Sequence, residues 1–149
     1  MENNPLHTVF LADDDPDDRY LFEEAFYAVA QHDSLVMAND GSELMRMLKL
    51  TVPPPPKVIF LDLNMPLKNG FQCLSEIRKN ETFKDIPVVI FSTSTEPKYI
   101  DQVFEDGANY YLCKPNSFPK LKSAITQVLS INWAEQPVNR VRDEFVLDC

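Results

Sequence analysis

Short apolar runs alternate along the chain with segments in which apolar residues recur at helical spacing. The runs are rich in β-branched and aromatic residues and mostly lack strict polar alternation, which is typical of strands buried on both faces of a parallel sheet. They cover residues 8–12, 35–38, 58–63, 88–91 and 110–113. The pattern β-α, repeated five times, predicts an α/β fold with right-handed crossovers and helices on both faces of the sheet.

The segments between the runs predict helices, each with one apolar stripe. The stripes are Leu21, Ala25, Phe26 and Val29; Leu44, Met47 and Leu48; Phe71, Leu74 and Ile77; Ile100, Val103 and Phe104; and Leu121, Ile125, Val128 and Leu129. Asp15 before Pro16 is typical of an N-cap followed by a proline in the first helical position, and Pro97 and Pro119 open later helices in the same way. These start signals agree with the apolar pattern.

Two segments differ from this alternation. The four prolines at 53–56 predict a stiff, extended connector into the third strand, although a ligand for a proline-binding module is an alternative. The tail at 133–149 is mixed and charged, and it fits a helix extension, an ordered flap or disorder. We therefore expect one domain over residues 6–131 and an extension over 132–149 that forms no separate domain.

Composition narrows the function classes. The 149 residues are 44% hydrophobic, enough for one core, and carry a net charge of −9. Such an acidic surface repels nucleic-acid phosphates and anionic lipid, so neither nucleic acid nor a membrane is expected as a partner. The N-terminus has no signal-peptide pattern and no apolar stretch approaches the ~20 residues that span a bilayer, so we expect a soluble, cytoplasmic protein.

Cysteine and histidine usage gives no sign of zinc. Cys73 and Cys113 lie within apolar patterns, where buried, reduced thiols are expected, and no CxxC pair is present. His7 and His32 lack a partner at ligand spacing.

Acidic residues gather where predicted strands end. The first strand is followed by Asp13, Asp14 and Asp15, and Asp62 lies at the end of the third. Ligands of open α/β sheets bind at these carboxyl ends. Two carboxylates ~4 Å apart repel by roughly 4 kcal/mol at an effective dielectric constant of ~20, so the cluster requires a neutralising cation. Hard carboxylate oxygens favour Mg²⁺ or Ca²⁺, and Mg²⁺ also ligates phosphate.

Two further residues at strand ends suit a phosphoryl group. Lys114 supplies a positive charge for its oxygens and Ser92 a hydroxyl donor, while Asp62 would be the nucleophile. Simpler structural interpretations exist for single residues: Asp15 is a helix cap, Lys114 alone could be a surface lysine, and 93–95 a turn.

Taken together, these stretches resemble the receiver domain of two-component response regulators. The resemblance covers about residues 6–130 and is carried by 9–15 (VFLADDD), 60–66 (FLDLNMP) with Gly70, 87–92 (PVVIFS) and 111–115 (YLCKP). It implies a flavodoxin-like (βα)5 doubly wound parallel sheet of five strands in the order 2-1-3-4-5. The stretches 13–18 (DDDPDD) and 92–94 (STS) further resemble single-domain receivers paired with bacterial phytochromes.

The resemblance implies a phosphorylation site. Asp62 is then the phosphoacceptor, and a sensor histidine kinase or a phosphotransfer protein supplies the phosphoryl group. Asp13, Asp14, Asp62 and the backbone carbonyl of Asn64 would hold Mg²⁺. Lys114 would contact the phosphoryl oxygens, and the Lys114–Pro115 peptide bond would be cis.

The resemblance also implies a conformational switch. Ser92 would move toward the phosphoryl group and Tyr111 would turn inward, which would remodel the face made by the fourth helix, fifth strand and fifth helix. With no output domain following, the signal would pass to a downstream effector protein that binds this face. Departures from the family pattern are Ser92, where Thr is commoner, and Thr93, where a small residue is frequent. Whether the chain forms a homodimer through this face stays open.

Three other functions are compatible with parts of the pattern. A Mg²⁺-dependent phosphatase with an aspartyl nucleophile would need a second acid where Asn64 stands. A flavodoxin would use Ser92–Thr95 as a phosphate loop, but this run lacks glycine and follows the wrong strand. A pseudo-receiver, which folds like a receiver but is not phosphorylated, would lack a key residue, and none is missing here. We therefore expect no enzymatic turnover beyond self-phosphorylation and self-dephosphorylation.

Overall fold

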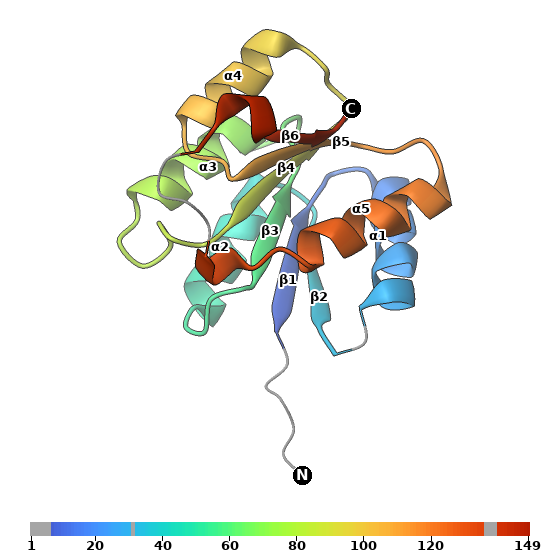
Figure 1. The fold of residues 1–149 in the computed structure, drawn as a ribbon. Coiled ribbons are helices and arrows are strands. Elements are labelled where there is room, and N and C mark those ends of the chain that lie inside the picture. The colour runs from blue at the N-terminus through green and yellow to red at the C-terminus, as the bar shows by residue number, and fades with distance from the viewer. Residues whose placement is uncertain (1–6, 31, 136–139) are drawn as a thin grey trace.

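One parallel sheet organises the molecule. The computed structural model describes residues 7–30, 32–135 and 140–149. The sheet order is β2-β1-β3-β4-β5-β6, and all arrows in Figure 1 point toward the same edge. The strands are β1 Thr8–Ala12, β2 Ser34–Ala38, β3 Val58–Leu61, β4 Val88–Ser92, β5 Tyr110–Cys113 and β6 Val146–Asp148. The predicted order 2-1-3-4-5 is confirmed for the first five strands.

Helices cover both faces of the sheet, with α1 and α5 on one and α2, α3 and α4 on the other (Figure 1). They are α1 Pro16–Val29, α2 Gly41–Thr51, α3 Gly70–Lys79, α4 Pro97–Glu105 and α5 Phe118–Leu129, with 3-10 turns η1 Trp133–Glu135 and η2 Arg142–Glu144. Across the described ranges, no helix is long and apolar enough to cross a membrane.

The two faces of the sheet receive alternate residues of each strand. Val9 and Leu11 of β1 pack with Phe22 of α1, whereas Phe10 packs with Leu44 of α2. Successive side chains of a strand point to opposite faces, so a strand covered on both sides has to be apolar throughout. This explains the continuous apolar runs and places the first polar residues at the ends of the strands.

A side-chain cap starts α1 directly after β1. The Asp15 carboxylate accepts hydrogen bonds from the backbone N–H groups of Asp17 and Asp18, at 2.8 and 3.2 Å, and Pro16 is the first helical residue. The prediction that Asp15 is a cap is confirmed. Because the cap sets where α1 begins, it holds the two preceding acids at the edge of the sheet.

The tail forms a sixth strand, so the predicted sheet of five strands was incomplete. The strand β6 pairs in parallel with β5, and the N–H of Tyr111 donates to the carbonyl of Phe145 at 3.0 Å. Phe145 is 2% exposed and supplies the apolar anchor that a mixed, charged segment needs to stay on the sheet. Of the three alternatives for the tail, an ordered segment is the correct one within the described residues 133–135 and 140–149.

The predicted reduced state of Cys113 is also wrong, because a disulfide joins it to Cys149. The pairing of β6 with β5 brings these residues, 36 positions apart, to a Cα–Cα distance of 4.8 Å. Spacing in the sequence gives no sign of it. Cys73 is a free, buried thiol, as predicted.

The proline run joins α2 to β3, in agreement with a connector. Its cis peptide bonds are Val52–Pro53 and Pro53–Pro54.

Candidate functional site

Three of the predicted acids meet at the carboxyl edge of the sheet. Asp13 follows β1 and Asp62 follows β3, and these strands are neighbours with Ala12 opposite Leu61. One carboxylate oxygen from each of Asp13, Asp14 and Asp62 lies within 4.8 Å of the other two. The expected cluster of strand-end carboxylates is therefore present in the fold.

Asp62 is held in a buried, well-defined position. Its side chain accepts a hydrogen bond from the backbone N–H of Leu63 at 2.8 Å, and its other oxygen lies 3.2 Å from Nζ of Lys114. Burial raises the pKa of Asp62 from 3.8 to about 6, the Asp13 charge adds to the rise, and Lys114 and the Leu63 N–H oppose it. A further positive charge nearby would therefore stabilise the ionised form of Asp62.

The Lys114 ammonium lies among three carboxylates. Its Nζ is 2.8 Å from Asp13, 2.9 Å from Asp18 and 3.2 Å from Asp62. Burial disfavours the charged form, but hydrogen bonds to Asp13 and Asp18 and the nearby charges outweigh it, so the pKa of Lys114 is raised. The lysine is thus charged at any physiological pH and partly offsets the repulsion between the acids.

The Asp13 carboxylate is placed to act as a ligand to a cation. Its side chain is 1% exposed, and Oδ1 accepts the N–H of Asp15 at 3.0 Å. Its Oδ2 lies 2.8 Å from the Lys114 ammonium and has no further partner within the described part of the chain. A buried carboxylate oxygen without a hydrogen bond is costly unless a charged group approaches it. This set of oxygens therefore fits a hard divalent cation.

Asp18 is a further residue of this site, and the sequence pattern did not reveal it. It lies in the first turn of α1, where an acid complements the helix dipole, and its carboxylate reaches Lys114 across the site. A first-turn acid three residues after an N-cap projects toward the same end of the sheet as the cap. Its contact with Lys114 depends on the distance between α1 and the end of β5, which only the fold provides.

Gly70 allows the backbone beneath the site to fold tightly. The N–H of Gly70 donates to the carbonyl of Leu63 at 3.0 Å as α3 begins. A Cβ atom at this position would lie 2.2 Å from the carbonyl oxygen of Asp62. Only glycine permits this approach, which fixes the backbone of the candidate phosphoacceptor.

The two predicted switch residues lie side by side but are already internal. Ser92 ends β4, is fully buried and accepts the N–H of Ser94 at 3.1 Å. Tyr111 is also fully buried, and its hydroxyl donates to the carbonyl of Ser94 at 2.8 Å. Burial raises the pKa of Tyr111, against the hydrogen bonds to Ser92 and Ser94. The structure thus has the tyrosine in the inward position.

Two predictions at this edge have different outcomes. The Lys114–Pro115 bond is not among the cis bonds of the described residues, so the cis prediction is wrong. The trans form is the intrinsically preferred one, by about 0.5–1 kcal/mol, and with it Lys114 still reaches the acids while its N–H donates to Ser92 at 2.8 Å. Asn64 is exposed in the loop after β3, two residues beyond Asp62, and its role as a ligand stays a prediction.

A comparison with known protein families decides what this arrangement is. The family model described as the response regulator receiver domain matches residues 9–126. The chain belongs to this family. Receiver domains are parts of two-component signalling systems, and the acidic pocket of Asp13, Asp14 and Asp62 is compatible with the phosphoryl and metal site of such a receiver.

Individual receivers are similar over nearly the whole chain. Response regulator Rcp1 of Synechocystis sp. is 31% identical over 138 residues, which cover 90% of this chain and 93% of Rcp1. A crystal structure of the Mn²⁺-bound form of Rcp1 has a TM-score of 0.74 at 29% identity, covering 91% of this chain and 99% of that one. The phosphorylated cyanobacterial phytochrome response regulator RcpA has a TM-score of 0.78 at 29% identity, covering 90% and 98%. The receiver is thus similar to single-domain regulators associated with phytochromes.

Proposed function

We propose that this receiver accepts a phosphoryl group on Asp62 in a Mg²⁺-dependent reaction. The observation that carries the proposal is the position of the Asp62 carboxylate, which is buried at a strand end beside two further acids and within 3.2 Å of the Lys114 ammonium. In the transfer, an oxygen of Asp62 forms the new bond to phosphorus as the bond between phosphorus and the donor breaks. With a phosphohistidine donor, the imidazole nitrogen keeps the electron pair and takes up a proton.

The chain's own groups supply most of what the transfer needs. Burial and the hydrogen bond from Leu63 hold Asp62 in one orientation, so little reorganisation precedes attack. Lys114 would pair with the phosphoryl oxygens, and the Ser92 hydroxyl would donate to one of them. These positions suit the charge spread over the phosphoryl group during transfer.

The cation is proposed to be Mg²⁺, held by Asp13, Asp14 and Asp62 together with the backbone carbonyl of Asn64. The buried Oδ2 atom of Asp13, which lies 2.8 Å from the Lys114 ammonium, and the all-oxygen donor set support a hard divalent ion, and the relative Rcp1 binds Mn²⁺. When bound, the ion supplies positive charge to the oxygens of the incoming phosphoryl group.

The signal is proposed to leave through the face made by α4, β5 and α5. Ser92 and Tyr111 are the proposed switch residues, because both contact the segment that leads from β4 into α4. The proposed partners are a sensor histidine kinase or phosphotransfer protein as donor and an effector protein as receiver of the signal. The association of RcpA with phytochrome suggests the same kind of kinase here. We propose no turnover of a separate substrate.

We further propose that the receiver comprises residues 6–131 and that 132–149 is an extension without a domain of its own. The family match to 9–126 and the addition of β6 to the same sheet support this division. Residue 6 and residues 136–139 lie outside the described residues. A cytoplasmic location belongs to the proposal, because the phosphodonor has itself to be phosphorylated from ATP.

Intact-protein mass spectrometry tests the proposal. The protein is incubated with acetyl phosphate and Mg²⁺, and a mass increase of one phosphoryl group is expected for the wild type. The isosteric variant Asp62→Asn should show none. The variant Asp17→Asn, which changes an exposed acid at the same edge, should be labelled like the wild type. Labelling that persists in Asp62→Asn would place the acceptor elsewhere.

A further inference from the structure

Residues 140–149 cover the outer edge of β5. The strand β6 pairs with this edge, and the carbonyl of Phe145 accepts the N–H of Tyr111 at 3.0 Å. The ring of Phe145 lies 5.1 Å from that of Phe104 and 6.3 Å from that of Tyr111. Without this segment, β5 would be an edge strand with unpaired N–H and C=O groups.

Noncovalent contacts attach the start of this segment to α4. Arg140 donates to the carbonyls of Phe104 and Ala108, and its guanidinium lies 4.2 Å from the centre of the Phe104 ring. Arg142 donates to Asp101 at 2.9 Å, but this pair is exposed and contributes little. The segment is thus well held near Phe145 and more weakly held beyond it.

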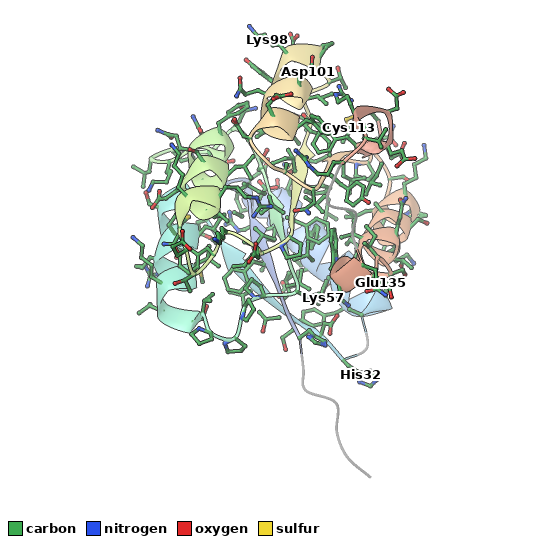
Figure 2. The ribbon with its side chains drawn as sticks, turned by 60° about the vertical axis from the view of Figure 1, so that its left-hand side comes forward. His32, Lys57, Lys98, Asp101, Cys113 and Glu135 are labelled. Carbon is green, nitrogen blue, oxygen red and sulfur yellow. A yellow bond between two sulfur atoms is a disulfide. The ribbon has the colours of Figure 1, made fainter. Side chains whose placement is uncertain are left out.

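A covalent bond closes the other end of β6. The disulfide joins Cys149, just after β6, to Cys113, the final residue of β5. Figure 2 shows Cys113 at the same end of the molecule as Asp101, far from His32 and Lys57. The next residue after Cys113 is Lys114, so the bond lies at the edge of the sheet that carries the acids.

The disulfide is open to small reagents. Cys149 is exposed and Cys113 half-buried, and a cavity of about 230 Å³ beside them is lined by both cysteines, Asp148 and Lys120. A low-molecular-weight thiol or disulfide fits a cavity of this size. Cys73, in contrast, is fully buried, and burial raises the pKa of its thiol to about 12, which leaves it unreactive.

We propose that Cys113 and Cys149 form a reversible thiol–disulfide site that controls whether β6 stays on the edge of β5. In the oxidised form the bond fixes the end of β6 and the edge of β5 is covered. In the reduced form β6 separates from β5 beyond the Phe145 anchor, and the backbone groups at the end of β5 become accessible. The site responds to the ratio of small-molecule disulfide to thiol, and this inference does not depend on phosphorylation of Asp62.

The exchange balances with a small-molecule disulfide as oxidant. The Cys149 thiolate attacks one sulfur of that disulfide, which gives a mixed disulfide and releases one small thiolate. The Cys113 thiolate then attacks the Cys149 sulfur, closes the internal bond and releases the second. Two protein thiols are oxidised, one small disulfide is reduced to two thiols, and the two protons of the protein thiols pass to the released thiolates.

The covalent part is tested by alkylation of the denatured protein after equilibration in glutathione buffers. The chain has three cysteines, so the reduced form takes up three alkyl groups and the oxidised form one, at Cys73. We expect a single transition between these two states as the proportion of oxidised glutathione rises, and the same transition in Cys73→Ser with one group fewer. Three alkyl groups under oxidising conditions, or stable mixed disulfides with glutathione, would overturn the assignment.

The structural part is tested by hydrogen exchange at the amides of β6, Val146–Asp148, which pairs with β5 beyond the Phe145 anchor. Reduction should speed their exchange by about tenfold or more, while the Asp62 amide, bonded to Ala12 in the middle of the sheet at 3.0 Å, should not change. Cys149→Ser should exchange like the reduced protein whether or not reductant is present. Equal exchange of the β6 amides in both redox states would overturn the proposal that β6 separates.

Discussion

The Lys114 ammonium is bound to the Asp18 carboxylate at 2.9 Å. Asp18 belongs to the first turn of α1, whereas Lys114 follows β5, so the pair connects two elements that are far apart in the sequence. The same ammonium is the group proposed to pair with the phosphoryl oxygens on Asp62. Asp18 would therefore compete with the proposed phosphoryl group for Lys114.

Replacement of this acid should make the proposed phosphorylation easier. In Asp18→Asn, Lys114 loses one charged partner and turns toward the phosphoryl group at lower cost. The pair is part-exposed, since the Asp18 side chain is 36% exposed. We therefore expect the activation free energy of phosphorylation to fall by about 1 kcal/mol, which corresponds to a rate increase of about fivefold with acetyl phosphate. Stopped-flow phosphorylation kinetics measure it.

The matched control is Asp17→Asn, which removes a neighbouring but exposed acid. It should react at the wild-type rate, and Asp18→Glu should restore most of the wild-type behaviour. A slower rate in Asp18→Asn would show instead that Asp18 holds Lys114 in its working position.

Divalent-cation binding should depend on the acids that follow β1. Removing two of the three clustered carboxylates in the double variant Asp13→Asn, Asp14→Asn should abolish Mg²⁺ binding in isothermal titration calorimetry. Lower repulsion among the acids should leave the variant at least as stable as the wild type without metal. Unchanged Mg²⁺ affinity in a folded double variant would refute the assignment of these ligands.

Stability should depend on pH through Asp62. Its pKa is raised from 3.8 to about 6 in the folded protein, so between these values the folded state binds more protons than the unfolded state. The unfolding free energy of the wild type should therefore fall as the pH rises from about 4 to about 6, by about 3 kcal/mol for this residue.

The comparison with Asp62→Asn isolates this contribution. Urea unfolding without divalent ions should show the variant more stable than the wild type near neutral pH, with the difference shrinking toward pH 4. Added Mg²⁺ should raise the stability of the wild type but not of the variant. A difference between the two proteins that is the same at every pH would contradict the prediction.

Gly70 should tolerate no side chain. A Cβ atom there would lie 2.2 Å from the Asp62 carbonyl oxygen, so Gly70→Ala has to displace the loop that carries Asp62. We expect a loss of about 1–3 kcal/mol in unfolding free energy and slower phosphorylation. Ser75→Ala, at an interior position of the same helix, should change neither. Wild-type kinetics in Gly70→Ala would show that the loop geometry does not matter for the reaction.

The sequence predicts most of this fold because its apolar runs are continuous. Strands covered on both faces are apolar throughout, as the all-buried residues 58–61 show, and the first polar residue after such a strand marks the functional edge. Asp13 and Asp62 were found in this way. Their closeness in space follows from the parallel pairing of the adjacent strands that they end.

What the sequence did not predict depends on distances between elements. Asp18 reaches Lys114 because of where α1 lies relative to β5. The sequence of the first turn of a helix does not show this distance. The strand β6 is three residues long, and its place follows from the burial of Phe145 and its bond to Tyr111. The Cys113–Cys149 pair follows in turn from β6, so one short strand accounts for two wrong predictions.

The central claim is that Asp62 itself carries the phosphoryl group. Borohydride reduces an acyl phosphate to an alcohol, so treatment of the phosphorylated protein converts the modified aspartate to homoserine, which tandem mass spectrometry of peptides can locate. The account predicts homoserine at position 62, dependent on both acetyl phosphate and Mg²⁺. Homoserine at position 13 or 14, or none at position 62 in a sample shown to be phosphorylated, would contradict it.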